Sequence, residues 1–91
     1  MDIIPQLAEK IIKEQESIIG PIALEQARKV DGLEVISDNK VKIVGNSKEV
    51  LQNLVDQYAK LFGQASIEVC REAVRGIIGQ GQRDQIPQVL L

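Results

Sequence analysis

The fold is decided by residues 5–30, which read PQLAEKIIKEQESIIGPIALEQARKV. Apolar residues recur in this stretch at the spacing of one helix face, and charged residues occupy the opposite face. The pattern is interrupted at Gly20-Pro21, because glycine suits the position after one helix and proline suits the start of the next. We therefore predict two helices, 5–19 and 21–30, that meet at Gly20. A single helix that Pro21 kinks is the alternative.

Residues 33–44 change to the alternating pattern of β-strands, and Asp38-Asn39 supplies turn chemistry. A two-residue turn would set Val35 beside Lys42. A three-residue turn through Lys40 would pair Val35 with Ile43, and Ser37 with Val41. We prefer the three-residue turn because it places the apolar side chains on one face, namely Leu33, Val35, Val41 and Ile43.

A second pair of helices is predicted after the hairpin. Asn46 is followed three residues later by Glu49, which resembles a capping box, although Ser47 is a competing cap. One helix then runs to Gly63, and another continues from there to about residue 78. The fold class is therefore α+β and mainly α, with helical hairpins at about 5–30 and 47–78 separated by the β-hairpin at 33–44. Residues 1–91 form one domain that ends in an apolar tail, 82–91.

The two helical pairs resemble each other when the chain is shifted by 43 positions. Gly20 then falls on Gly63, and the apolar positions of both helices stay in phase. Gly20, Pro21 and Gly63 are accordingly predicted to be structural corners. The shift predicts two halves of one shape. A true duplication and a chance alignment of amphipathic helices remain alternative origins for it.

Composition argues against several classes of function. The chain has no histidine and one cysteine, Cys70, so the commonest general base, a zinc site and an internal disulfide are missing. We expect a protein that is not an enzyme and has no catalytic, metal or cofactor site. With 11 basic and 13 acidic residues that are interleaved, the net charge is −2, so we expect no nucleic-acid partner. No signal peptide or membrane-spanning stretch is evident, so we expect a cytoplasmic protein without a membrane partner.

The hairpin and the tail are the candidate interaction sites. A lone two-stranded hairpin has open edges that invite pairing with a second copy, and the tail adds apolar side chains beyond the last helix. Pro87 favours an extended tail. We therefore predict a homodimer whose interface includes Leu33, Val35, Val41, Ile43, Ile86, Val89, Leu90 and Leu91.

The segment Ile18–Ala23, IIGPIA, resembles the "IGPIA" segment of a small helical domain attached to bacterial signalling proteins. The resemblance implies a regulatory or scaffolding domain that acts through protein contacts, with another signalling protein as a further partner. We therefore expect a non-catalytic interaction or oligomerisation module. The alternatives are a nucleic-acid-binding regulator that uses Arg71 and Arg75, and a small-molecule sensor with an apolar pocket between the helical hairpins.

Overall fold

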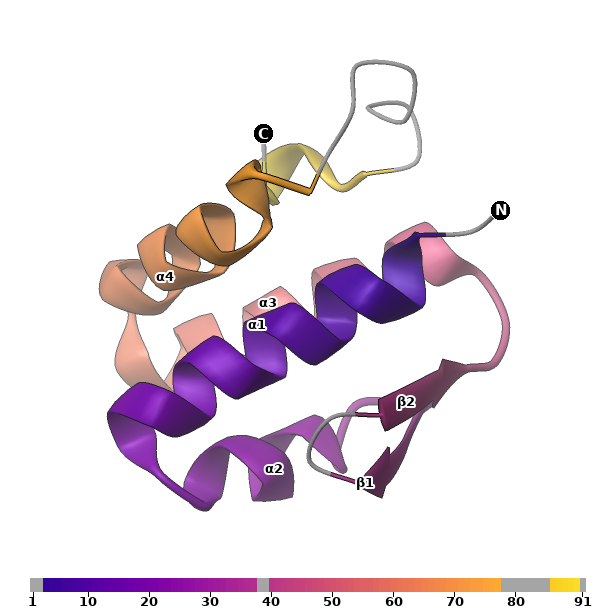
Figure 1. Ribbon diagram of the computed structural model, residues 1–91, viewed down its shortest axis with the longest axis horizontal. Helices are drawn as coiled ribbons and strands as arrows, with labels where there is room; N and C mark the ends of the chain where they lie inside the picture. The colour runs from indigo at the N-terminus through magenta and orange to yellow at the C-terminus, as the bar shows by residue number, and fades with distance from the viewer. Residues whose placement is uncertain (1–2, 38–39, 78–85, 91) are drawn as a thin grey trace.

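The computed structural model describes residues 3–37, 40–77 and 86–90. Helices α1 (Ile4–Ile19) and α2 (Ile22–Ala27) are followed by strands β1 (Leu33–Ser37) and β2 (Lys40–Ile43). Helices α3 (Ser47–Phe62) and α4 (Gln64–Arg75) follow, and the 3₁₀ turn η2 (Gln88–Leu90) lies near the C-terminus. The mainly helical α+β fold, with the β-hairpin between the helical pairs, is therefore confirmed (Figure 1).

Both glycine corners have the predicted role and almost the same geometry. Gly20 has φ 74° and ψ −153°, and Gly63 has φ 76° and ψ −160°. At each corner the glycine N–H donates to the carbonyl four residues back, and its own carbonyl accepts from the residue three positions on, with N···O distances of 2.8–3.1 Å. The chain therefore breaks at both corners, and the alternative of one kinked helix through Pro21 is excluded.

The ends of the second helix in each pair differ from the prediction. Helix α2 ends at Ala27, and turns carry the chain on to Val30, whose N–H donates to the Ala27 carbonyl. Helix α4 ends at Arg75, whereas the sequence predicted about residue 78, which lies outside the described residues. At the start of α3, Asn46 is the cap, because its side chain accepts from the Glu49 N–H at 2.9 Å.

The hairpin keeps the predicted apolar face but changes the predicted register. Leu33 pairs with Ile43, Val35 with Val41, and Ser37 with Lys40, and the register shifts between Val35 and Ser37. The three-residue turn through Lys40 is therefore wrong. A bulge around Ile36 absorbs one residue, so two residues connect the strands and the apolar side chains still share one face.

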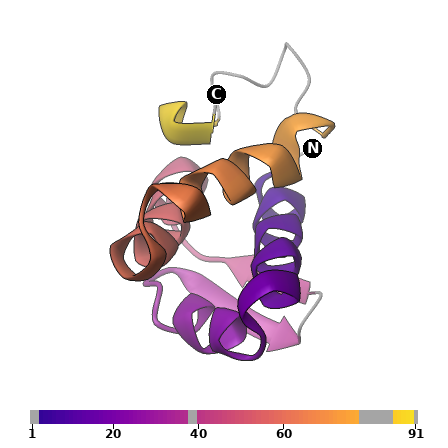
Figure 2. The same ribbon diagram turned by 90° about the vertical axis from the view of Figure 1, so that its left-hand side faces the viewer.

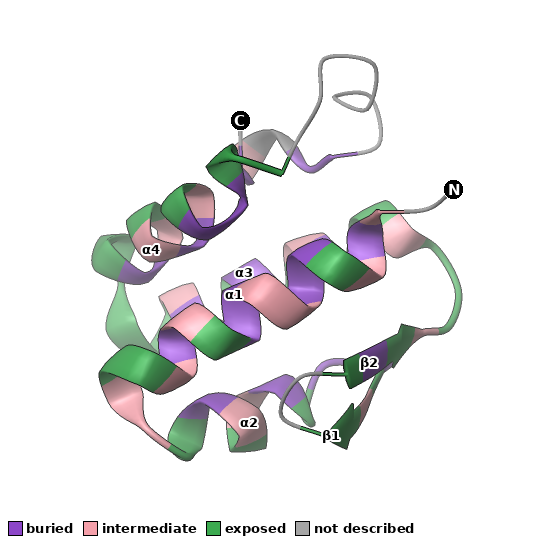
Figure 3. Cartoon of the chain, viewed as in Figure 1, coloured by how far each residue is buried: buried purple, intermediate pink, exposed green. Residues whose placement is uncertain are grey.

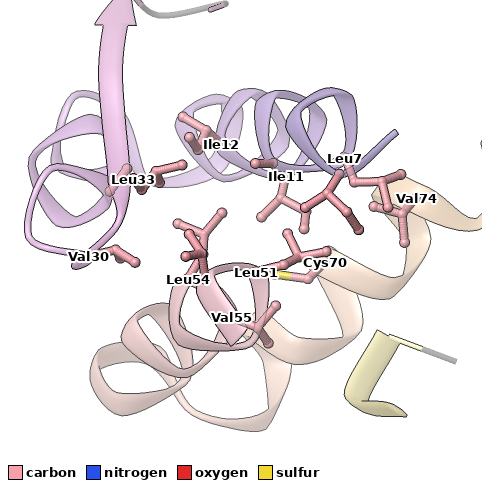
Figure 4. Packing of buried hydrophobic residues seen from close by; sticks show 14 of the residues in the cluster. Leu7, Ile11, Ile12, Val30, Leu33, Leu51, Leu54, Val55, Cys70 and Val74 are labelled. Carbon is pink, nitrogen blue, oxygen red and sulfur yellow. The ribbon is translucent and has the colours of Figure 1, made fainter. Parts of the chain in front are cut away.

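The core lies where α1, α3 and α4 meet, with α2 and the hairpin covering one side (Figures 1 and 2). Leu7 and Ile11 of α1 point toward Leu51 and Leu54 of α3, and Cys70 approaches from α4 (Figure 4). In Figure 3 the buried colour follows the inward stripe of each of these helices. Aliphatic side chains fill most of this centre, and such side chains allow close helix packing.

The described part of the tail, residues 86–90, packs on its own chain. Ile86 and Leu90 belong to the core cluster, and η2 packs against α4. Residues 88–90 form a 3₁₀ turn in place of the extended segment that Pro87 suggested. The physical reason is that α4 lies within the tail's own reach, so Ile86 and Leu90 are buried without a second chain.

Candidate functional site

The two helical pairs bury equivalent residues, and this equivalence organises the molecule. We call residues 7–30 the first unit and residues 50–73 the second unit. Shifting by 43 positions superimposes every buried position of one unit on a buried position of the other. The pairs are Leu7/Val50, Ala8/Leu51, Ile11/Leu54, Ile12/Val55, Gln15/Tyr58, Ala23/Ser66, Ala27/Cys70 and Val30/Ala73.

Two buried hydrogen bonds connect the units reciprocally. The Gln15 Nε2 of the first unit donates to the Ser66 carbonyl of the second at 3.2 Å. The Tyr58 hydroxyl of the second unit donates to the Ala23 carbonyl of the first at 2.7 Å. Because Gln15 corresponds to Tyr58 and Ala23 to Ser66, each unit makes to the other the contact that it receives. This reciprocity is the property of a two-fold relation, here within one chain.

Sequence reasoning did not single out these polar partners. Gln15 lies in the apolar stripe of α1 and Tyr58 in that of α3, and both are buried. The sequence signal that could have identified them is the 43-residue shift, which aligns Gln15 with Tyr58, and both of these side chains carry a hydrogen-bond donor. A buried donor needs a partner, and the corresponding carbonyl in the opposite unit supplies it.

Exposed apolar side chains gather at the corners. Helices α1 and α3 run side by side in the same direction, so both corners lie at the end that faces the viewer in Figure 2. Ile18 is 62% exposed and Ile22 45% at the first corner, while Leu61 is 49% and Phe62 39% exposed at the second. We call these four residues the corner surface. Figure 3 shows the exposed colour at both corners.

The sequence pattern assigned these four residues to core-facing stripes. The stripes do continue into the last turns of α1 and α3, but Ile18, Leu61 and Phe62 are exposed there, and so is Ile22 at the start of α2. Ile18 and Leu61 occupy equivalent positions of the two units, whereas Ile22 corresponds to Ala65 and Phe62 to the half-buried Ile19. The recurrence of Ile-Ile and Leu-Phe just before a glycine was the available signal.

Charged residues occur in the last turns of both α1 and α3. Within residues 15–24 the only charged side chain is Glu16, and within residues 58–67 it is Lys60. No ion pair between them is formed in the described part of the chain.

The predicted interface residues lie mostly inside their own chain. The structure buries Leu33, Val41, Ile86 and Leu90 in the core, so these four offer no exposed surface to a partner. Three others are half-buried against that core, namely Val35, Ile43 and Val89. Leu91 lies outside the described residues. The reason is that the apolar face of the hairpin packs on α1, and the tail packs on α4.

The two edges of the hairpin are not equivalent. β2 lies on the α1 side, and the Val41 N–H donates to Glu9 Oε2 at 3.1 Å, so a carboxylate closes this edge. β1 forms the outer edge (Figure 1). The alternation of an antiparallel ladder turns the Val35 backbone groups away from β2, because Gly32 and Val44 form a hydrogen-bonded pair. The bulge around Ile36 shortens the straight part of this edge.

The buried ionisable groups act as structural residues. Burial raises the pKa of the Cys70 thiol to about 11, while a contact from Gln15 Nε2 at 3.5 Å favours the thiolate more weakly. Burial also raises the pKa of Tyr58 well above its usual value. Both groups are therefore held in the protonated form near neutral pH, which is unfavourable for a thiolate nucleophile.

The arginines of α4 are engaged with neighbouring acids. Arg71 forms an ion pair with Glu68 at 3.6 Å, and Arg75 pairs with Glu72 at 2.9 Å. The corresponding pair of the first unit, Glu25 with Arg28, is not formed among the described residues. The basic side chains of α4 thus alternate with acids, and this interleaving weakens attraction to phosphate.

A polar groove of about 360 Å³ lies between the end of α2 and α3. Its lining is Lys29, Val30, Asp31, Asn53, Asp56, Gln57 and Lys60. A hydrogen bond between side-chain amides connects α3 to α2 beside this groove, because Gln57 Nε2 donates to Gln26 Oε1 at 2.7 Å. Its polar lining differs from the apolar pocket that a small-molecule sensor of the predicted kind would need.

Among residues 3–37, 40–77 and 86–90, no three His, Cys, Asp or Glu side chains are grouped so as to hold a metal ion. No helix in those ranges has the length and apolarity needed to cross a membrane. No protein-family model, curated protein or solved structure matches this chain.

Proposed function

We propose that this chain is a non-catalytic interaction module that binds another protein through the corner surface. The observation that carries the proposal is the gathering of Ile18, Ile22, Leu61 and Phe62, all exposed, at one end of the molecule. Apolar residues that are exposed together, on a chain this small, are typical of a protein contact. Covering them removes apolar area from water, at roughly 25 cal/mol per Å².

The construction of the site also supports binding over catalysis. The four side chains come from the ends of α1 and α3 and the start of α2, and the glycine corners and the reciprocal hydrogen bonds hold these ends in place. A preorganised apolar surface loses little conformational entropy when a partner covers it. The resemblance of Ile18–Ala23 to the "IGPIA" domain adds a signalling or scaffolding role to the proposal, because that segment forms the first corner.

A site-specific photo-crosslinker tests this proposal. The reactive residue is placed at Ile18 or at Leu61 in the full chain, and the protein is irradiated in its own host cell. We expect a discrete protein adduct from both positions, identified by mass spectrometry. Ile36 is the matched control, since it is 60% exposed but lies on the hairpin.

Two outcomes would contradict the proposal. One is the absence of any protein adduct from positions 18 and 61. The other is the same adduct at the same yield from position 36, which would indicate random collision. The substitution Ile18→Glu can also be made in the chain that carries the crosslinker at position 61. Loss of the adduct in this double variant would support the proposal, because Ile18 belongs to the same surface.

A further inference from the structure

We draw no further inference here: the strongest candidate, the apolar corner surface at the ends of α1 and α3 and the start of α2, belongs to the site already described, and nothing in the structure shows what covers it.

Discussion

At the residue scale, Gly63 and Gly76 differ in backbone conformation but not in surroundings. A Cβ would meet nothing within 4 Å at either position. Gly63 has φ 76°, whereas Gly76 has φ −81°, in the right-handed region that any residue adopts. The cost of adding a methyl group is therefore a test of backbone strain alone.

We expect Gly63→Ala to lower the free energy of unfolding by about 1–2 kcal/mol, because an L residue is strained at positive φ. Gly76→Ala is the control and should be neutral or stabilising by up to about 1 kcal/mol. Urea denaturation followed by circular dichroism measures both. Equal effects at the two glycines would contradict the role of Gly63 as a corner.

Tyr58 and Gln15 are the polar residues that the core requires to be paired. Tyr58→Phe removes the donor to the Ala23 carbonyl and leaves that carbonyl buried, so we expect a loss of about 1–3 kcal/mol in the free energy of unfolding. Phe62→Tyr adds a hydroxyl where the ring is partly exposed, and serves as the control with little expected change. A Tyr58→Phe protein as stable as the wild type would show that the hydrogen bond contributes nothing net.

Cys70 predicts a pH dependence of stability. Its pKa is raised from 9.0 to about 11 by burial, so the unfolded chain loses the thiol proton first as pH rises. The stabilising contribution is complete below pH 9 and is lost between about pH 9 and pH 11. Cys70→Ala introduces the residue found at the equivalent position of the first unit, Ala27. We expect this variant to lose less of its free energy of unfolding than the wild type between about pH 9 and pH 11. The rest of the loss remains because the pKa of Tyr58 is raised as well. Denaturation curves at several pH values test this, and an identical slope in the variant would contradict it.

At the element scale, the tail is a part of the domain. Ile86 is 1% exposed, whereas Val89 is only half-buried. We expect Ile86→Ala to cost about 2–4 kcal/mol in stability and Val89→Ala less than about 1 kcal/mol, because a cavity forms only at the first position. Both variants should keep the wild-type oligomeric state by light scattering. A change from dimer to monomer in a folded Ile86→Ala variant would contradict this and would indicate that the tail contributes to a dimer interface.

At the scale of the whole molecule, the two units are expected to depend on each other. Each unit buries its apolar stripe against the other, and the hydrogen bonds of Gln15 and Tyr58 cross between them. We expect fragments 1–45 and 46–91 to lack a cooperative thermal transition when separate, because each leaves half the core in water. Mixing them should restore helicity measured by circular dichroism. A fragment that melts cooperatively alone would show an independent unit.

The sequence by itself determined the features that depend on local rules. The 3.6-residue period placed the helices, positive-φ glycine placed both corners, and alternation placed Leu33, Val35, Val41 and Ile43 on one face of the hairpin. The shift by 43 positions indicated two halves of one shape, and this is confirmed for the first helices and the corners, whereas α2 has 6 residues and α4 has 12. Whether the halves arose by duplication stays a prediction.

Only the tertiary structure decided what covers each apolar face. A hydrophobic stripe shows which way a side chain points, but not whether another element reaches far enough to bury it. Ile86 and Leu90 are therefore covered by their own chain, while Ile18 and Leu61 remain exposed at the corners. The bulge at Ile36 has the same origin, because it lets both strands keep their apolar face on α1 although only two residues connect them. These outcomes depend on distances between elements far apart in the sequence, which local patterns do not encode.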